Sequence, residues 1–183
     1  MTVPWPYPAP ADDGAARHLV VGLPLPDIAL PATGGGTVNL ARADGLVVVF
    51  VYPWTGRSGL ADPAGWDTIP GAHGSTPEAE GFRDRHADFG ALGVAVYGLS
   101  TQDGEHQREL VQRLRLPFEI LSDSDLAFAG ALRLPSFAID GVTYLKRLTL
   151  IVRDGRIAHT FYPVHPPPAH AAEVLAFLQS RGA

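Results

Sequence analysis

The 183 residues contain no cysteine. This absence excludes disulfides, thiolate metal sites and every thiol reaction in the chain as written. The histidines are poorly arranged for a metal as well, because His165 and His170 lie in a proline-rich stretch and no His-Glu-x-x-His occurs. We therefore expect no metal site and no cofactor.

Long apolar runs and basic clusters are also missing. No run of about 18 apolar residues exists that could span a bilayer. The opening residues, Met1–Pro8, lack the basic stretch and apolar core of a secretory signal, so the cytoplasm is the expected compartment. The net charge is −5 and the basic residues are scattered, with only a short Lys146-Arg147 pair. Nucleic acid and anionic membranes are therefore not expected as partners.

The length and the 46% hydrophobic content fit one domain with a substantial core. Residues 1–22 are rich in proline, alanine and aspartate, which predicts an irregular N-terminal arm that lies on the domain or moves freely. The domain itself is expected to cover residues 23–183.

Apolar runs and turn residues predict the strands. Residues 46–52 read LVVVFVY, which is typical of a strand buried on both faces, and residues 94–99 and 118–121 are further strands. Asp154-Gly155 joins residues 148–152 and 157–162 as a hairpin. Another hairpin is expected at the N-terminus, where residues 27–30 and 37–40 flank three glycines.

Helices are predicted between these strands. The first covers residues 76–89, with Thr76 as N-cap and Pro77 as first helical residue. The others cover residues 103–114, 125–132 and 169–180. This alternation predicts an α/β protein with a thioredoxin-like fold, in which helices flank a mixed central β-sheet.

Four segments carry a family resemblance. They are residues 47–53, residues 74–84 with the sequence GSTPEAEGFRD, residues 99–103 with 116–123, and residues 146–152 before the Asp154-Gly155 turn. In this order and spacing they resemble the peroxiredoxin family (AhpC/TSA type), most closely its Q-type or bacterioferritin-comigratory branch. The resemblance covers roughly residues 22–180. Ser75 occupies the position of the family's peroxide-attacking cysteine, and Glu80 that of its second cysteine.

The resemblance implies a thiol-dependent peroxidase that reduces hydrogen peroxide or organic hydroperoxides. Position 75 would precede a helix N-terminus, where free N–H groups and the helix dipole favour an anion such as a thiolate. The resemblance gives Arg147 the role of polarising the peroxide bond, and Pro53 resembles the proline of the family's active site. A serine hydroxyl is a far weaker acid and has no comparable sulfenic chemistry, so this chain is expected to be inactive.

The sequence departs from the family pattern before Ser75. The family's proline and hydroxyl positions hold Thr68 and Ala72, and the loop over residues 54–74 is unusually long. The candidates for the missing hydroxyl and for the peroxide pocket are Thr55, Thr68, His73, Gly74 and Thr76. Glu80 implies a one-cysteine cycle in the parent, with an external thiol such as glutathione or a thioredoxin-like partner. Trp54 and Trp66 are expected to anchor the long loop or to form the interface of a homodimer rather than to stack on a substrate.

Several alternatives stay open at this point. Ser75 is either an engineered Cys-to-Ser change or native to a non-catalytic thioredoxin-fold binding or regulatory protein. Ser75 and Glu78 also fit a capping box, Arg147 could be a surface cation, and Arg83 with Asp84 could be an exposed pair or could orient the site. A serine hydrolase is disfavoured, because the chain lacks Gly-x-Ser-x-Gly around Ser75.

Overall fold

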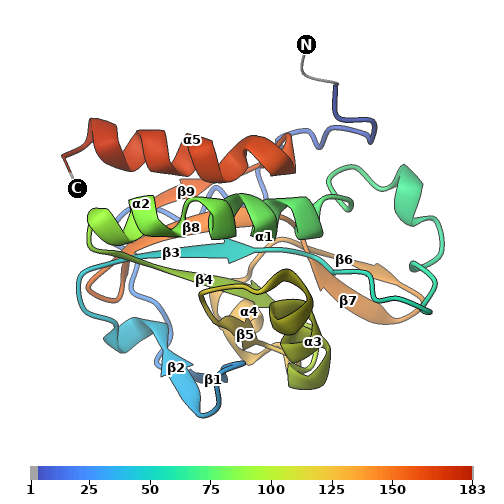
Figure 1. Ribbon diagram of the computed structural model, residues 1–183, viewed down its shortest axis with the longest axis horizontal. Helices are drawn as coiled ribbons and strands as arrows, with labels where there is room; N and C mark the ends of the chain where they lie inside the picture. The colour runs from blue at the N-terminus through green and yellow to red at the C-terminus, as the bar shows by residue number, and fades with distance from the viewer. Residues whose placement is uncertain (1–3, 183) are drawn as a thin grey trace.

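A five-stranded sheet forms the centre of the computed structural model, which describes residues 4–182 (Figure 1). The strand order is β5-β4-β3-β8-β9. The parallel strands are β3 (Leu46–Val51), β4 (Val94–Ser100) and β5 (Ile120–Ser122). The antiparallel strands are β8 (Leu148–Arg153) and β9 (Arg156–Phe161). This arrangement confirms the predicted mixed sheet.

Strand β3 lies in the middle of the sheet, and all six of its residues are buried. Val47, Val49 and Val51 contribute to the core on one face, and Val48 and Phe50 to the core on the other. The uninterrupted apolar run follows from this position, because a strand with two covered faces has no side that needs polar residues.

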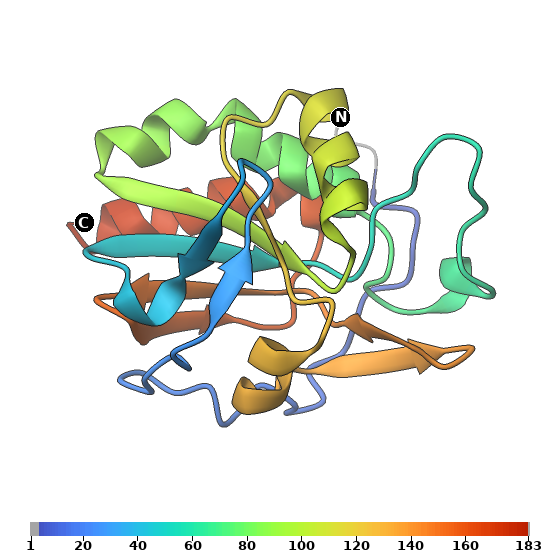
Figure 2. The same cartoon turned by 90° about the horizontal axis from the view of Figure 1, so that it is seen from below.

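Helices cover one face of the sheet, and a helix with a hairpin covers the other (Figures 1 and 2). The first face carries α1 (Ser75–Asp84), α2 (His86–Ala91), α3 (Gly104–Leu114) and α5 (Pro167–Ser180). The second carries α4 (Ala127–Leu132) and the predicted N-terminal hairpin of β1 (Ala29–Pro31) and β2 (Thr37–Asn39). The thioredoxin-like prediction is therefore confirmed. No helix within residues 4–182 has the length and apolarity needed to cross a bilayer.

Two predicted details are wrong. The single helix expected over residues 76–89 is two helices, because the backbone leaves the helical region at Arg85 (φ −107°, ψ 8°). A hairpin that the sequence analysis did not assign is formed by β6 (Ser136–Ile139) and β7 (Val142–Leu145), which meet at Asp140-Gly141. Two short 3-10 helices, η1 (Leu40–Arg42) and η2 (Trp66–Thr68), complete the elements.

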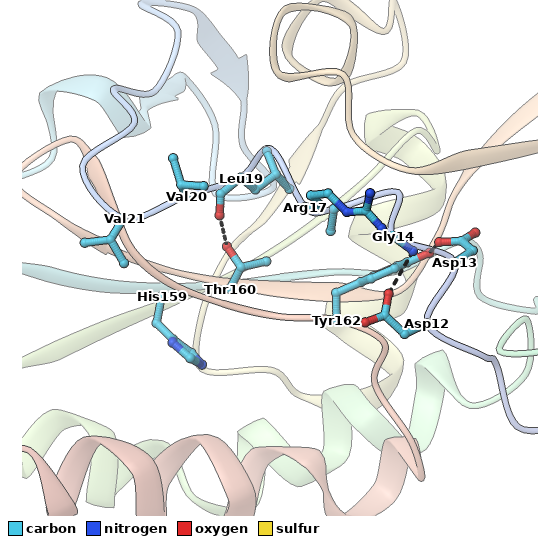
Figure 3. Close-up of a pocket in the computed structure, with 11 residues that line it drawn as sticks. Asp12, Asp13, Gly14, Arg17, Leu19, Val20, Val21, His159, Thr160 and Tyr162 are labelled. Atoms are coloured by element: carbon cyan, nitrogen blue, oxygen red, sulfur yellow. Dashed lines mark hydrogen bonds between the residues drawn. The ribbon is translucent and has the colours of Figure 1, made fainter.

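The described part of the N-terminal arm, residues 4–22, contains no helix or strand, and its second half runs along β9. Its Gly22 amide donates to the Ile157 carbonyl at 2.8 Å, and the Thr160 hydroxyl donates to the Leu19 carbonyl at 3.0 Å (Figure 3). An open cavity of 690 Å³ lies between the arm and β9, where Figure 3 shows the lining side chains. These contacts hold the arm against the domain.

Candidate active site

Helix α1 begins two residues earlier than the predicted cap implies. Gly74, not Thr76, is the N-cap residue, and its backbone is left-handed (φ 108°). A Cβ at Gly74 would lie 2.6 Å from Pro167 and 3.0 Å from Trp5. Only glycine suits this conformation and this close approach, which brings the start of α1 against the start of α5. Ser75 is thereby the first residue of the helix.

The hydroxyl of Ser75 faces a guanidinium at the start of α1. Nη2 of Arg147 donates to Ser75 Oγ at 3.0 Å, and both residues are 3% exposed. The same nitrogen lies 3.2 to 3.4 Å from the carbonyl oxygens of Gly71, Ala72 and His73. Arg147 is therefore held by the segment that leads into α1 and is not a surface cation.

Glu78 holds the other side of this guanidinium. Its Oε2 accepts a hydrogen bond from Arg147 Nη1, and both side chains are essentially inaccessible to solvent. Burial raises the pKa of Glu78, while the charges of Arg147 and His170 act in the opposite direction. The capping-box prediction is wrong, because Glu78 turns inward to Arg147 and Ser75 makes no cap. Sequence reasoning missed this role of Glu78, although its place one helical turn after Ser75 was a usable signal.

A cavity of 270 Å³ opens above Ser75. Four aromatic side chains from the arm and the long loop line it: Trp5, Tyr7, Trp54 and Trp66. His73 also lines it and stacks on Tyr7, with ring centroids 3.7 Å apart. The arm thus forms one wall of the site, which the sequence analysis did not foresee.

The predicted pocket residues do not all reach this cavity. Thr55, His73, Gly74 and Thr76 line it. Thr68 does not, since it lies in the exposed η2 turn, where its hydroxyl donates to the Gly65 carbonyl at 2.8 Å. Pro53 is buried at the end of β3 and is not a lining residue. Glu80 points away, partly exposed, with its carboxylate 3.8 Å from Arg83.

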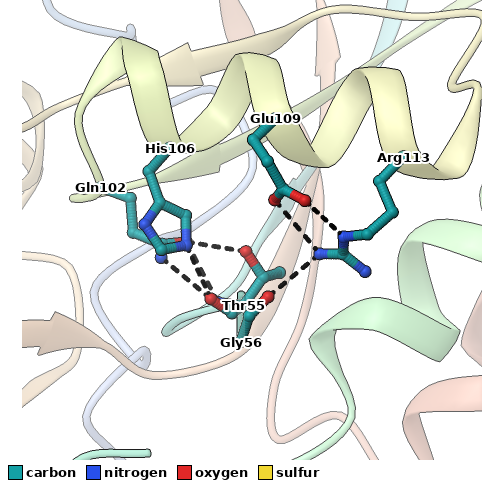
Figure 4. Close-up of polar contacts among 6 residues, drawn as sticks. All are labelled: Thr55, Gly56, Gln102, His106, Glu109 and Arg113. Atoms are coloured by element: carbon teal, nitrogen blue, oxygen red, sulfur yellow. Dashed lines mark hydrogen bonds and ion pairs between the residues drawn. The ribbon is translucent and has the colours of Figure 1, made fainter. Parts of the chain in front are cut away.

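Thr55 is fixed from outside the cavity by α3 and the residue before its cap (Figure 4). The amide and hydroxyl of Thr55 both donate to Gln102 Oε1 at 3.1 Å, and Gln102 Nε2 donates back to the Thr55 carbonyl. That carbonyl also lies 2.8 Å from His106 Nε2, and Arg113 donates to the Gly56 carbonyl at 3.0 Å. These contacts hold the cavity rim in place.

The long loop is anchored within its own chain. Trp66 is 3% exposed and packs edge-on against Tyr144 of the β6–β7 hairpin, with centroids 5.2 Å apart. Trp54 packs on Trp66 at 5.6 Å. The unassigned hairpin therefore supports the loop that carries the cavity wall.

The sequence analysis also raised roles for the Arg83-Asp84 pair and for a base beside Ser75. Arg83 and Asp84 form an exposed pair that does not touch Ser75, and Arg83 instead donates to the Leu114 carbonyl at 3.1 Å. His73 bonds Asp67 and makes no hydrogen bond to Ser75 in the described chain, which leaves a serine hydrolase without its base.

One group among the described residues has metal-ligand character. Ligand atoms of Asp62, Asp67 and His73 lie within 4.8 Å of one another. The prediction of no metal rested on the absence of cysteine and on the histidine spacing, and it did not consider these carboxylates. Both carboxylates are exposed to solvent, and we assign no ion to them.

Residues 20–175 match the sequence pattern of the Redoxin family. The chain belongs to the Redoxin family. Its relatives include the chloroplastic peroxiredoxin Q of Oryza sativa subsp. japonica, 26% identical over 98% of this chain and 78% of that protein. A putative peroxiredoxin of the bacterioferritin-comigratory type from Coxiella burnetii is 27% identical over 86% of this chain and 97% of its own.

Solved structures agree with this placement. A peroxidoxin from Mycobacterium tuberculosis has 25% identity and a TM-score of 0.71, covering 89% of this chain and 98% of its own. A Cys-to-Ser mutant of peroxiredoxin Q from Xylella fastidiosa has 21% identity and a TM-score of 0.73, covering 91% and 99%, and shows the shared fold. The resemblance to Q-type peroxiredoxins is confirmed.

The geometry defines what this Redoxin site can do. A group at position 75 sits at a helix start with a charged donor 3.0 Å away. Such a place stabilises negative charge on the group, and it can bind a small polar molecule through the same donors. Serine there keeps the hydrogen bonding and lacks the acidity of a thiol.

Proposed function

We propose that this chain carries the peroxide site of a thiol-dependent peroxidase with serine in the nucleophile position. The observation that carries the proposal is the contact of Ser75 Oγ with Arg147 Nη2 at the first residue of α1. A cysteine there would gain thiolate character from the same guanidinium and helix start. The chain as written is then inactive, and its cysteine form reduces hydrogen peroxide or organic hydroperoxides.

In the cysteine form the thiolate sulfur attacks one peroxide oxygen. The O–O bond breaks, the sulfur becomes a sulfenic acid, and the second oxygen leaves as water or an alcohol after taking up a proton. Arg147 stabilises the charge that develops on the leaving oxygen, and Glu78 holds the guanidinium in position. An external thiol, such as glutathione or a thioredoxin-like protein, then reduces the sulfenic acid, because Glu80 occupies the second cysteine position.

The test is a Ser75→Cys variant assayed for peroxide consumption with a thiol donor. We expect turnover, a sulfenic acid at residue 75, and a thiol pKa below the free value of about 8.5. Ser75→Ala is the matched control and should stay inactive. A folded Ser75→Cys variant with no turnover on any thiol donor and no sulfenic acid would refute the proposal.

A second candidate is a non-catalytic binding or regulatory protein that uses the same cavity. The complete absence of cysteine favours it, because an intact serine site without any thiol can bind and not react. The source gene decides between the two: a serine codon at position 75 supports the binding protein, and a cysteine codon supports an engineered peroxidase variant.

Partners and compartment complete the proposal. We also propose a homodimer whose interface includes the long loop. Sedimentation equilibrium tests this by measuring whether the chain is a monomer or a dimer. The cytoplasm is the proposed compartment, and a fluorescent fusion tests it. Similar plant proteins are chloroplastic by name.

A further inference from the structure

A second cavity lies near Arg147 and shares no lining residue with the cavity above Ser75. We call it the back cavity. Its volume is 360 Å³, which is at the small end of the range for ligand sites. It forms where the N-terminal arm crosses the end of the long loop, and its lining residues are Pro10, Ala11, Asp13, Ile69, Pro70, Gly71, Phe137, Lys146, Arg147, Tyr162 and Pro163.

Most of this lining is apolar. Ile69, Pro70 and Phe137 belong to the loop and the β6–β7 hairpin, while Pro10 comes from the arm. Small-molecule sites typically combine such apolar walls with a few polar groups that set the orientation of the ligand. The back cavity has this composition.

The charges that line the back cavity are already paired. The carboxylate of Asp13 accepts hydrogen bonds from Lys146 Nζ at 2.6 Å and from the Tyr162 hydroxyl at 2.7 Å. Arg147 is paired with Glu78. A charged ligand would therefore lose its hydration without meeting an unpaired opposite charge, which is unfavourable.

Hydrogen-bond donors remain in excess there. Nε of Arg147 is a buried atom with no hydrogen-bond partner among the described residues. An ammonium has three N–H groups, and Lys146 uses one of them on Asp13. Arg147 Nε is sealed from solvent and is out of a ligand's reach. The N–H groups that Lys146 does not use on Asp13 can donate to an acceptor oxygen on a ligand.

We propose that the back cavity binds a compact, uncharged carbonyl compound, such as a ketone, ester or amide with an apolar body. The apolar part packs against Ile69 and Phe137, and the carbonyl oxygen accepts from Lys146 Nζ. This site adjoins the peroxide site through Arg147, which lines the back cavity and also donates to Ser75 Oγ.

The test compares three probes of similar size by amide chemical-shift titration of the full chain: acetophenone, ethylbenzene and benzoate. We expect acetophenone to shift the amides of Gly71, Phe137 and Lys146 and to leave that of Thr76 unchanged. Ethylbenzene lacks the carbonyl, so the loss of one hydrogen bond should make its affinity about tenfold lower than that of acetophenone. Benzoate should also bind more weakly than acetophenone. Shifts confined to Thr76, equal affinity for all three probes, or no shifts at all would overturn the proposal.

Two variants sharpen the test. Ile69→Trp should fill the cavity and abolish the acetophenone shifts, while Trp54→Phe, on the other cavity, should leave them unchanged. Lys146→Met should reduce the ratio of the acetophenone affinity to the ethylbenzene affinity. A general disturbance of the arm would weaken both probes and leave this ratio unchanged. Full acetophenone binding by Ile69→Trp, or an unchanged ratio in Lys146→Met, would contradict the proposed contacts.

Discussion

Lys146 and Arg147 are neighbours in sequence, and each pairs with a carboxylate, but their surroundings differ. The side chains of Arg147 and Glu78 are 1% and 0% exposed, whereas those of Lys146 and Asp13 are 36% and 40% exposed. The Arg147–Glu78 pair, here the inner pair, lies beneath the first turn of α1. The Lys146–Asp13 pair, here the outer pair, joins the arm to the domain.

The difference in burial decides what each pair contributes. Water solvates the partner left behind when an exposed pair is broken, so the loss is small. A buried charge that loses its partner keeps its desolvation cost and becomes strongly destabilising. The inner pair should therefore govern folding and the site, and the outer pair the attachment of the arm.

Removing the carboxylate of the inner pair should have the largest effect on stability. Glu78→Ala leaves Arg147 buried without its partner, and we expect the free energy of unfolding to fall by about 3–5 kcal/mol. Urea denaturation measures this loss. Glu80→Ala, two residues further along the same helix and partly exposed, is the control and should change stability by about 0.5 kcal/mol or less. Similar losses in the two variants would contradict the assignment.

A smaller loss is expected when the backbone beside the inner pair is strained. Gly74→Ala places a methyl group 2.6 Å from Pro167 in a left-handed conformation, which should cost about 1–3 kcal/mol. Gly90→Ala in α2 meets no atom within 4 Å and should be neutral or stabilising by up to about 1 kcal/mol. Thermal melts should therefore show a lower melting temperature for Gly74→Ala and an unchanged or higher one for Gly90→Ala.

Breaking the outer pair should have the smallest effect on folding. Lys146→Met or Asp13→Asn should lower the free energy of unfolding by less than about 1 kcal/mol, and added salt should shrink the effect. Salt-dependent urea denaturation of both variants and of the parent chain measures it. A loss as large as that of Glu78→Ala would show that exposure does not separate the two pairs.

The outer pair should also respond to acid. Hydrogen bonds from Lys146 and Tyr162 lower the pKa of Asp13. Because the folded pKa lies below the unfolded value of about 3.9, the contribution of Asp13 is fully present above that value and is lost as the pH falls below it. The amide of Ala15, which donates to Asp13 Oδ1 at 3.0 Å, should report this transition in an NMR titration. An Ala15 shift that follows a normal aspartate pKa would show that the contacts are absent in solution.

Local patterns predicted the sheet and the placement of position 75 well. The run LVVVFVY, the Asp154-Gly155 turn and the segment around Ser75 each carry their signal within a few residues. The β6–β7 hairpin was missed although Asp140-Gly141 is a similar turn. Its strands have four residues each, and no residue of β6 is fully buried. The inward turn of Glu78 and the wall formed by Trp5 and Tyr7 depend on contacts between distant segments, which no local pattern records.

The position of the arm has a practical consequence for handling the protein. Trp5 lies against Gly74 and lines the cavity above Ser75, so a label attached to the arm near Trp5 would lie close to that cavity. Helix α5 instead starts at the site and carries the chain away from it over 14 residues, or about 21 Å. Labels are therefore better placed beyond the end of α5 than on the N-terminal arm.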